Sequence, residues 1–488
     1  MQIIGNHKKR TSKVLGCIAL VIIVLVLIII MAVAVYNIYS TAVSDMLVVD
    51  KVFRIAPLTL GFLTAYRISF MLLGLLFKAK VFPETEKRYK YCCLIPARNE
   101  ETVLPGLLDS IKKQNYPQDL ITLFVIADNC TDNTAEIARQ AGAIVFERIN
   151  PPKHERRKGY ALDFLIKRIN ETVEGGIESF DGAFILDADN VLAENFFHEM
   201  NKAFDQKQYD FFSNYISPKN MTNTLSAYGG VLGITSNATM RRPLAQLGLS
   251  LRARGNTPLF RTHIIKDGWK WHALLEDMQC SCDLIAKGVR SIYVEAAETF
   301  DEQVEEFKMF NRQRMRWLHG GFIVFCKYFF RLLGGMFTFR RRNIAQRFSA
   351  YEALVASFPY AVASLIFTIL YPIGVCIFLL ATSGAVSAIM TALISIGLVY
   401  LGYYIQEVAK TIAAVIREHR HLRIKPLRLT MYIFAFPFIS IYTQYLNMIA
   451  IFTPTQWKRI KRYSTKTSTD IAGEKVLVEH MKKTKGEG

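Results

Sequence analysis

Long apolar runs are the feature that most limits what this chain can fold into. Val14 to Tyr36 contains no charged residue, and at about 1.5 Å per residue a helix of this length can cross a hydrocarbon core of about 30 Å. Ile55 to Phe77 is a second run, interrupted by Arg67 alone. Three further runs follow, at Ala353–Thr382, Val386–Ile405 and Thr430–Phe452. The sequence therefore predicts an integral membrane protein.

The charge balance agrees with that interpretation. Lys and Arg number 60 against 41 Asp and Glu, a net charge of +19, and such an excess suits either nucleic acid or an anionic membrane surface. The apolar runs favour the membrane, so we expect no nucleic-acid partner. The first run is much longer than the apolar part of a signal peptide, about 7–15 residues, so we expect an uncleaved anchor.

Basic residues fix the expected topology. Lys8 to Lys13 precede the first run, which predicts a cytoplasmic N-terminus, and two crossings return the chain to the cytosol. We expect a multi-pass protein of the plasma membrane with a cytosolic catalytic domain. The predicted units are two transmembrane helices (1–77), the catalytic domain (78–321), an interfacial helix region (322–350), transmembrane or interfacial helices (351–456) and a basic cytosolic tail (457–488).

The last apolar run leaves two topologies open. A single crossing by Thr430–Phe452 would place the basic stretch Lys458–Arg462 outside, against the positive-inside rule. Pro437 favours a re-entrant or interfacial helix pair instead. Phe322–Phe339 and Glu407–Leu422 have the composition of helices that lie on the bilayer surface.

The central region alternates short apolar strands with helices. Strands are predicted at Tyr91–Ile95, Ile121–Ala127, Ala143–Phe146 and Ala183–Leu186, and helices at Glu101–Gln114, from a Thr131 or Asp132 cap to Gly142, and at Lys158–Ile169. Unbroken apolar strands of this kind indicate an α/β fold with a mostly parallel sheet covered on both faces. Ligands of such sheets bind beyond the carboxyl ends of the strands.

Acidic residues follow the predicted strands at that edge. Asp187 and Asp189 come directly after the last strand, and two carboxylates there suit a hard divalent cation that bridges a diphosphate. Asp128 and Glu100 follow two other strands and can accept hydrogen bonds from a ribose or a base edge. The alternative interpretation is a set of solvated turns and helix caps.

Three further groups carry chemistry of their own. Lys158 opens a helix, where a phosphate could bind, or the basic run from Arg156 to Lys158 is an ordinary solvated turn. A carboxylate of Glu276-Asp277 could act as a general base on a hydroxyl, or the pair is an ordinary acidic helix start. Arg316 could pair with a diphosphate and Trp317 could stack on a sugar, although basic and aromatic residues also line membrane surfaces. The cysteine spacing predicts no zinc site.

Taken in order, these segments resemble a known family. The segments are Ile95-Pro96-Ala97-Arg98-Asn99-Glu100, Ala127-Asp128-Asn129, Lys158-Gly159, Asp187-Ala188-Asp189, Glu276-Asp277 and Gln313 to Trp317. The set resembles the processive, membrane-embedded enzymes of glycosyltransferase family 2, such as cellulose, hyaluronan and poly-N-acetylglucosamine synthases. The resemblance implies a GT-A, Rossmann-like catalytic domain. Two positions depart from the family pattern, because Leu275 stands where Thr is usual and Arg157 where Gly is usual.

The resemblance implies a role for each matching residue. Residues that would bind the nucleotide sugar are Pro96, Glu100, Asp128, Lys158 and Asp187. Asp189 would bind Mg²⁺ or Mn²⁺. Asp277 would be the general base with Glu276 beside it, and Arg316 would stabilise the leaving diphosphate. Residues that would hold the acceptor are Gln313, Trp317, Gly255 and Asn256.

The expected function follows from that resemblance. It is inverting, processive synthesis of a β-linked polysaccharide from a UDP-sugar, with UDP-glucose favoured, and export through the protein's own helices, where Arg67 would face the path. One alternative is a non-processive transferase that moves a single sugar onto a lipid. Another is a non-catalytic membrane partner of a glycan exporter. Product size separates the first two, and release of UDP separates both from the third.

Overall fold

A sheet of eight strands organises the described part of the chain. The computed structural model describes residues 70, 73–253, 255, 257–338, 342–357, 373, 385–455, 460 and 462–474. The strands are β1 Tyr91–Ala97, β2 Ile121–Asp128, β3 Ile144–Arg148, β4 Gly182–Ile185, β5 Val191–Leu192, β6 Phe211–Pro218, β7 Leu259–Arg261 and β8 Ser291–Asp301. Their order across the sheet is β3-β2-β1-β4-β7-β6-β8-β5.

Most of the pairings are parallel, as predicted. The strands β3, β2, β1 and β4 pair in parallel, and so do β6 and β8. The short strand β7 runs antiparallel to both of its neighbours, and β5 runs antiparallel to β8. The prediction of an α/β fold with a mostly parallel sheet is therefore confirmed. The antiparallel strands β5 and β7 were not predicted, because they are too short to show the alternation of apolar and polar residues that indicates a strand.

Alternate residues of β1 explain why both faces of the sheet are covered. Cys93 packs in one apolar cluster with Leu107 of α3 (Leu104–Lys112), whereas Leu94 packs in another with Leu165 of α5 (Lys158–Thr172). Successive side chains of a strand point to opposite faces. Two further helices, α4 (Thr134–Gln140) and α6 (Phe196–Phe204), complete this part of the domain.

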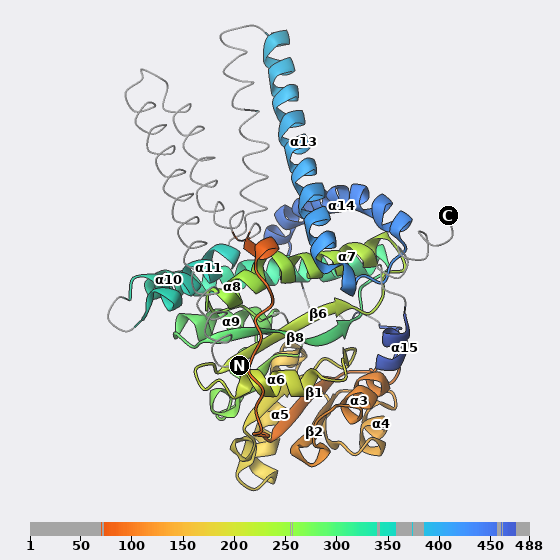
Figure 1. The fold of residues 1–488 in the computed structure, drawn as a ribbon, viewed down its shortest axis with the longest axis vertical. Coiled ribbons are helices and arrows are strands. Elements are labelled where there is room, and N and C mark those ends of the chain that lie inside the picture. The colour runs from red at the N-terminus through yellow and green to blue at the C-terminus, as the bar shows by residue number, and fades with distance from the viewer. Residues whose placement is uncertain are drawn as a thin grey trace, which may run out of the picture.

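A layer of helices lies across one end of the sheet (Figure 1). It contains α7 (Thr224–Ser236), α8 (Arg242–Gln246), α9 (Glu276–Ala286), α10 (Phe307–Met336), α11 (Ile344–Ser357) and α14 (Pro426–Phe452). From this layer α13 (Ala385–Glu418) rises away from the sheet (Figure 1). The predicted interfacial segment from Phe322 is continuous with the helix that carries Trp317, because both belong to α10. The second interfacial candidate, from Glu407, is largely the end of α13.

The last apolar run forms one helix, so the predicted helix pair is wrong. Pro437 lies inside α14, and the helix continues on both sides of it. By length and composition α14 is the one helix in the described segments that could cross a membrane, and 22 % of its most apolar window is buried. The runs Val14–Tyr36 and most of Ile55–Phe77 and Ala353–Thr382 lie outside the described residues, as does Arg67.

Part of the predicted basic tail packs on the domain that contains the sheet. Within the tail, α15 (Ser468–Gly473) places Ile471, which is fully buried, against Val191 and Phe300. Figure 1 shows α15 beside α3, at the edge of the sheet. The tail is basic, as expected, but its buried isoleucine and its hydrogen bonds hold it to the protein surface.

Buried charges join α13 to the sheet. Arg242 forms ion pairs with Glu295 and with Glu418, the last residue of α13. Just beyond it, His421 contacts Glu298 at 2.9 Å. Burial alone would lower the pKa of His421, but the hydrogen bond and charge of Glu298 outweigh it and raise the pKa. These contacts hold the end of α13 and the segment that follows it against β8.

Candidate active site

A cavity of about 680 Å³ opens at the carboxyl ends of the strands. This volume lies within the range of about 300–1,000 Å³ that small-molecule sites occupy. The cavity lies between the loops after β1, β2 and β4, the start of α9, and one face of α10. Every predicted site residue except Asn256, which lies outside the described residues, lines it. The sequence thus identified the wall of one cavity from segments more than two hundred residues apart.

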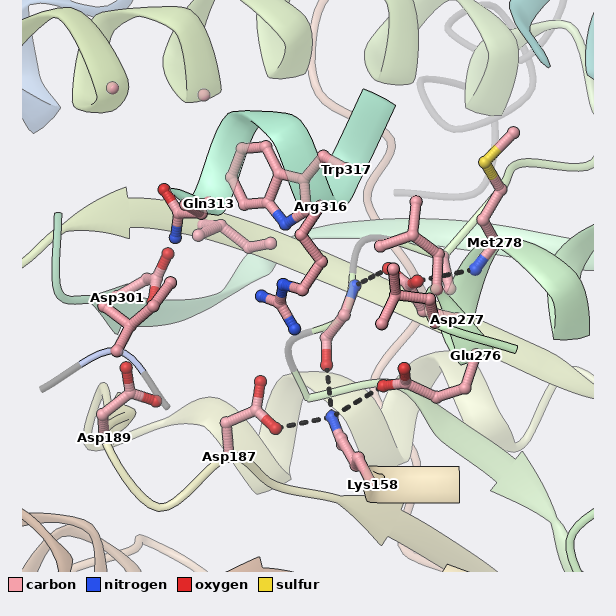
Figure 2. Close-up of a pocket in the computed structure, with 18 of the residues that line it drawn as sticks. Lys158, Asp187, Asp189, Glu276, Asp277, Met278, Asp301, Gln313, Arg316 and Trp317 are labelled. Atoms are coloured by element: carbon pink, nitrogen blue, oxygen red, sulfur yellow. Dashed lines mark hydrogen bonds and ion pairs between the residues drawn. The ribbon is translucent and has the colours of Figure 1, made fainter. Parts of the chain in front are cut away.

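Lys158 is the centre of a charged cluster on the floor of the cavity (Figure 2). Its Nζ lies 2.5 Å from Asp187 Oδ1 and 3.6 Å from Glu276 Oε1, and it donates to the Gly255 carbonyl at 3.1 Å. Burial alone would lower the pKa of Lys158, but these carboxylates outweigh it and raise the pKa. Burial raises the pKa of both Asp187 and Glu276, and the lysine partly offsets that effect.

Asp128 is positioned by a partner that the sequence did not reveal. Its carboxylate accepts two hydrogen bonds from Arg148, at 2.8 and 2.9 Å, and both side chains are buried. Asp128 and Arg148 end the paired strands β2 and β3, which explains why they meet. Pro96, near the end of β1, and Glu100, after it, line the same cavity. A bidentate pair of this kind gives a carboxylate a fixed orientation.

Asp189 is paired with the C-terminal segment. Arg462 Nε lies 2.9 Å from Asp189 Oδ2, and Arg462 lines the cavity. Burial would lower the pKa of Arg462, but Asp189 and nearby acidic groups raise it. The segment is held in place by the Glu302 carboxylate, which accepts from the backbone of Tyr463 and Ser464 at 2.9 and 3.0 Å. The Arg462 guanidinium therefore contacts the carboxylate that was expected to bind Mg²⁺ or Mn²⁺.

Asp277 lies in the first turn of α9. One oxygen accepts from the backbone nitrogen of Gly255 at 2.6 Å, and the other accepts from that of Met278 at 2.7 Å. Asp277 and Glu276 begin the helix, where its positive end stabilises a carboxylate. The pair thus begins a helix, as the ordinary interpretation expects, and it also lines the cavity, which leaves its proposed role as a base open to test.

The helix α10 forms the opposite wall. Gln313, Arg316 and Trp317 project from it toward the carboxylates (Figure 2). Burial lowers the pKa of Arg316, and among the described residues its Nε has no hydrogen-bond partner. Trp317 keeps 38 % of its surface exposed. The wall thus offers a guanidinium and an aromatic ring to a ligand between α10 and α9.

The carboxylates of Asp187 and Asp189 fit a divalent cation that shares its ligands with a substrate. In the described segments no group of three or more His, Cys, Asp or Glu residues could hold a metal ion. Mg²⁺ is typically bound by one or two carboxylates together with substrate phosphates and water. A divalent cation held by Asp187 and Asp189 would replace Lys158 and Arg462, which contact these carboxylates here.

Comparisons with known proteins agree with this geometry. Residues 90–320 match the family described as "Glycosyltransferase like family 2". A probable glycosyltransferase, YdaM of Bacillus subtilis, is 24 % identical over 263 residues, which are 52 % of this chain and 60 % of the relative. A 4,4'-diaponeurosporenoate glycosyltransferase of Staphylococcus haemolyticus is 44 % identical over 63 residues, 13 % of this chain and 16 % of that protein. The matches thus span less than two thirds of these relatives.

Among solved structures, the mannosyltransferase PcManGT of Pyrobaculum calidifontis, in complex with GDP-Man and Mn²⁺, is similar at a TM-score of 0.45 and 15 % identity. That match covers 79 % of this chain and 96 % of PcManGT. S. aureus TarS (residues 1–349) is similar at a TM-score of 0.38 and 12 % identity, and the match covers 74 % of this chain and 89 % of that one. Residues 90–320 are therefore similar to glycosyltransferase family 2, and they contain the eight-stranded, mostly parallel sheet of the α/β fold.

Proposed function

We propose that the protein is an inverting, processive glycosyltransferase that polymerises a β-linked polysaccharide from a nucleotide sugar, with UDP-glucose as the favoured donor. One observation carries this proposal. Asp277, Arg316 and the Asp187–Asp189 pair, which come from three distant segments, line a single cavity. This combination offers a base for the acceptor, a cation for the leaving group and a site for a metal.

The proposed chemistry is a single displacement. Asp277 takes the proton of an acceptor hydroxyl while its oxygen attacks the anomeric carbon, and the bond from that carbon to the diphosphate oxygen breaks. Arg316 and Lys158 stabilise the negative charge on the departing nucleotide. A divalent cation held by Asp189 would neutralise the diphosphate further. General base assistance is worth roughly 10²–10⁴-fold in rate.

The donor half of the proposal rests on the nucleotide edge of the cavity. Asp128, fixed by Arg148, and Glu100 lie where ligands of parallel sheets bind. PcManGT is described with GDP-Man, and TarS with UDP and with UDP-GlcNAc. We favour a uridine donor from the family resemblance, with UDP-N-acetylglucosamine as the next choice after UDP-glucose.

Export of the product is the second part of the proposal. The apolar helix α14 belongs to the helix layer above the cavity, and α13 adjoins that layer. The other apolar runs of the sequence would add further membrane helices to these two. A membrane location at the cytoplasmic face would let a growing chain pass directly from the cavity into the bilayer. Arg67 would face that path, since a charge within a membrane helix is costly unless it is sheltered.

One observation favours a second candidate function. The 63-residue match to a 4,4'-diaponeurosporenoate glycosyltransferase points to transfer of one sugar onto a lipid acceptor. That reaction would use the same donor site, base and metal. It differs in the acceptor and in the size of the product, and it needs no export path.

The experiment is a donor panel with the full chain in membrane vesicles. UDP-glucose, UDP-N-acetylglucosamine and GDP-mannose are each supplied with Mn²⁺ or Mg²⁺, and nucleotide release and product size are measured. The proposal predicts release of UDP and a long glycan inside the vesicle. A single-sugar lipid product would establish the second candidate, and no nucleotide release with any donor would contradict both.

A further inference from the structure

The wall of the cavity also includes residues of α8, of α11 and of the segments next to α8 that have no part in the proposed transfer. They are Met240, Arg241, Leu244, Arg252 and Glu352, and we call this part of the wall the α8–α11 lobe. It begins next to Asp277, because the backbone of Ala253 donates to Ser281 Oγ at 2.7 Å and Ser281 Oγ donates to the Asp277 carbonyl at 2.7 Å. The segment that carries Arg252 and Ala253 therefore lies against α9, the helix that carries Asp277.

Glu352 is held against this lobe by the turn before it. Ser349, three residues earlier on α11, accepts a hydrogen bond from the backbone of Ser250 at 2.8 Å. Residues three apart share a helix face, so Glu352 faces the segment that carries Arg252. Its side chain is 3 % exposed, and within the described ranges its carboxylate has no hydrogen bond or ion pair. A buried carboxylate without a partner is costly.

Arg252 lies on the same wall and also forms no ion pair with any described residue. Its carbonyl accepts from Arg241 at 3.4 Å, and Arg241 donates to Ser213 Oγ at 2.6 Å. Both Arg252 and Glu352 act electrostatically on the thiol of Cys282, with opposite signs. An anion and a cation thus line one lobe without contacting each other, which leaves both for a ligand between them.

We propose that Glu352 and Arg252 bind hydroxyl groups of a glycan acceptor beside its reacting end. A sugar hydroxyl can donate to Glu352 while another accepts from Arg252. An apolar lipid chain in the lobe would bury both charges without compensation, which the cost of desolvation disfavours. This inference rests on the proposed function and chooses the glycan as its acceptor. Both residues are specificity-determining rather than catalytic.

The test separates the acceptor from the donor. Glu352→Gln and Arg252→Gln are assayed with cellobiose and with N,N'-diacetylchitobiose as soluble acceptors, and donor turnover to water is measured without an acceptor. Loss of a hydrogen bond to a charged group predicts a rise of roughly tenfold or more in the KM for the disaccharide. We expect little change in the donor KM and in hydrolysis, and partial recovery in Glu352→Asp.

Controls keep the outcomes distinguishable. Glu171→Gln, at an exposed carboxylate of α5, should leave every parameter unchanged, and thermal unfolding of each variant reports folding. An equal loss of hydrolysis and of acceptor use would contradict the inference, as would an unchanged disaccharide KM. Use of a lipid acceptor in vesicles, without any use of the disaccharides, would also overturn it. Failure of the proposed function appears separately, as no nucleotide release by the wild-type chain.

Discussion

The two ends of the cavity differ in whether their charged side chains form ion pairs with each other. At the donor end each central charge has a partner, since Lys158 lies between Asp187 and Glu276, and Asp189 contacts Arg462. In the α8–α11 lobe, the wall described by Met240, Arg241, Leu244, Arg252 and Glu352, no ion pair joins Arg252 to Glu352 in the described chain. The charges of the donor end are therefore already paired, and a ligand that binds there must replace some of these partners. At the other end a ligand completes the pairing.

The largest expected effect comes from breaking the donor-end cluster. Lys158→Met leaves Asp187 and Glu276 without their shared cation, and removing one partner of a buried pair costs about 3–5 kcal/mol. These groups are partly exposed, so the lower end of that range applies. We expect loss of donor binding and a lower unfolding temperature, measured by nucleotide-sugar titration and thermal unfolding.

The matched control for this change is Lys167→Met. Lys167 lies on the same helix and pairs with Asp163, but it is 62 % exposed. It should keep donor affinity and unfold within a degree or two of the wild type. Equal effects of the two substitutions would show that the Lys158 cluster has no special part in donor binding.

A smaller effect is expected where the C-terminal segment meets the donor end. Arg462→Gln frees Asp189 of its guanidinium, so the affinity for Mn²⁺ without nucleotide should rise about tenfold, since a hydrogen bond to a charged group is worth about 1.5–3 kcal/mol. Electron paramagnetic resonance of free Mn²⁺ measures this directly. Arg168→Gln, on the exposed face of α5, is the control. Unchanged Mn²⁺ affinity in Arg462→Gln would argue that Asp189 is not a metal ligand.

The smallest effect is a shift in the pH dependence of donor turnover. Burial raises the pKa of Asp187 and Glu276, so both carboxylates gain protons at a higher pH than ordinary ones do. The acidic limb of kcat/KM should therefore lie above about 4, the usual range of Asp and Glu. Activity falls as the pH drops through that limb. A limb at or below the usual range would mean that these carboxylates do not need to be charged.

Most of the donor end was predictable, because its residues follow the strands whose ends must meet. Asp128 ends β2 and Asp187 follows β4, and both strands belong to the parallel part of the sheet. Arg148 was missed, although it ends β3 beside Asp128, since a single arginine after a strand has no distinguishing pattern. A search for opposite charges at neighbouring strand ends would have found it.

The C-terminal segment and the α8–α11 lobe could not be predicted in the same way. Arg462 looked like one of several basic tail residues, and its contact with Asp189 spans more than two hundred and fifty residues. Glu352 precedes an apolar run directly, so it resembled the charged flank of a membrane helix. Contacts between distant segments outside the sheet depend on how helices and loops pack. The hydrophobic periodicity of the sequence predicts single helices and strands, not such contacts.

The most direct test of a single transfer site is the Asp277→Asn variant. Asn keeps the shape of the side chain and can still accept from the backbone nitrogen of Gly255, although it then loses the hydrogen bond from Met278. It cannot take a proton from an acceptor. We predict that sugar transfer falls by roughly 10²–10⁴-fold while donor affinity, measured by titration, stays within about twofold of that of the exposed control Asp267→Asn. Transfer at a near-normal rate by Asp277→Asn would contradict the assignment of the base and with it the central claim.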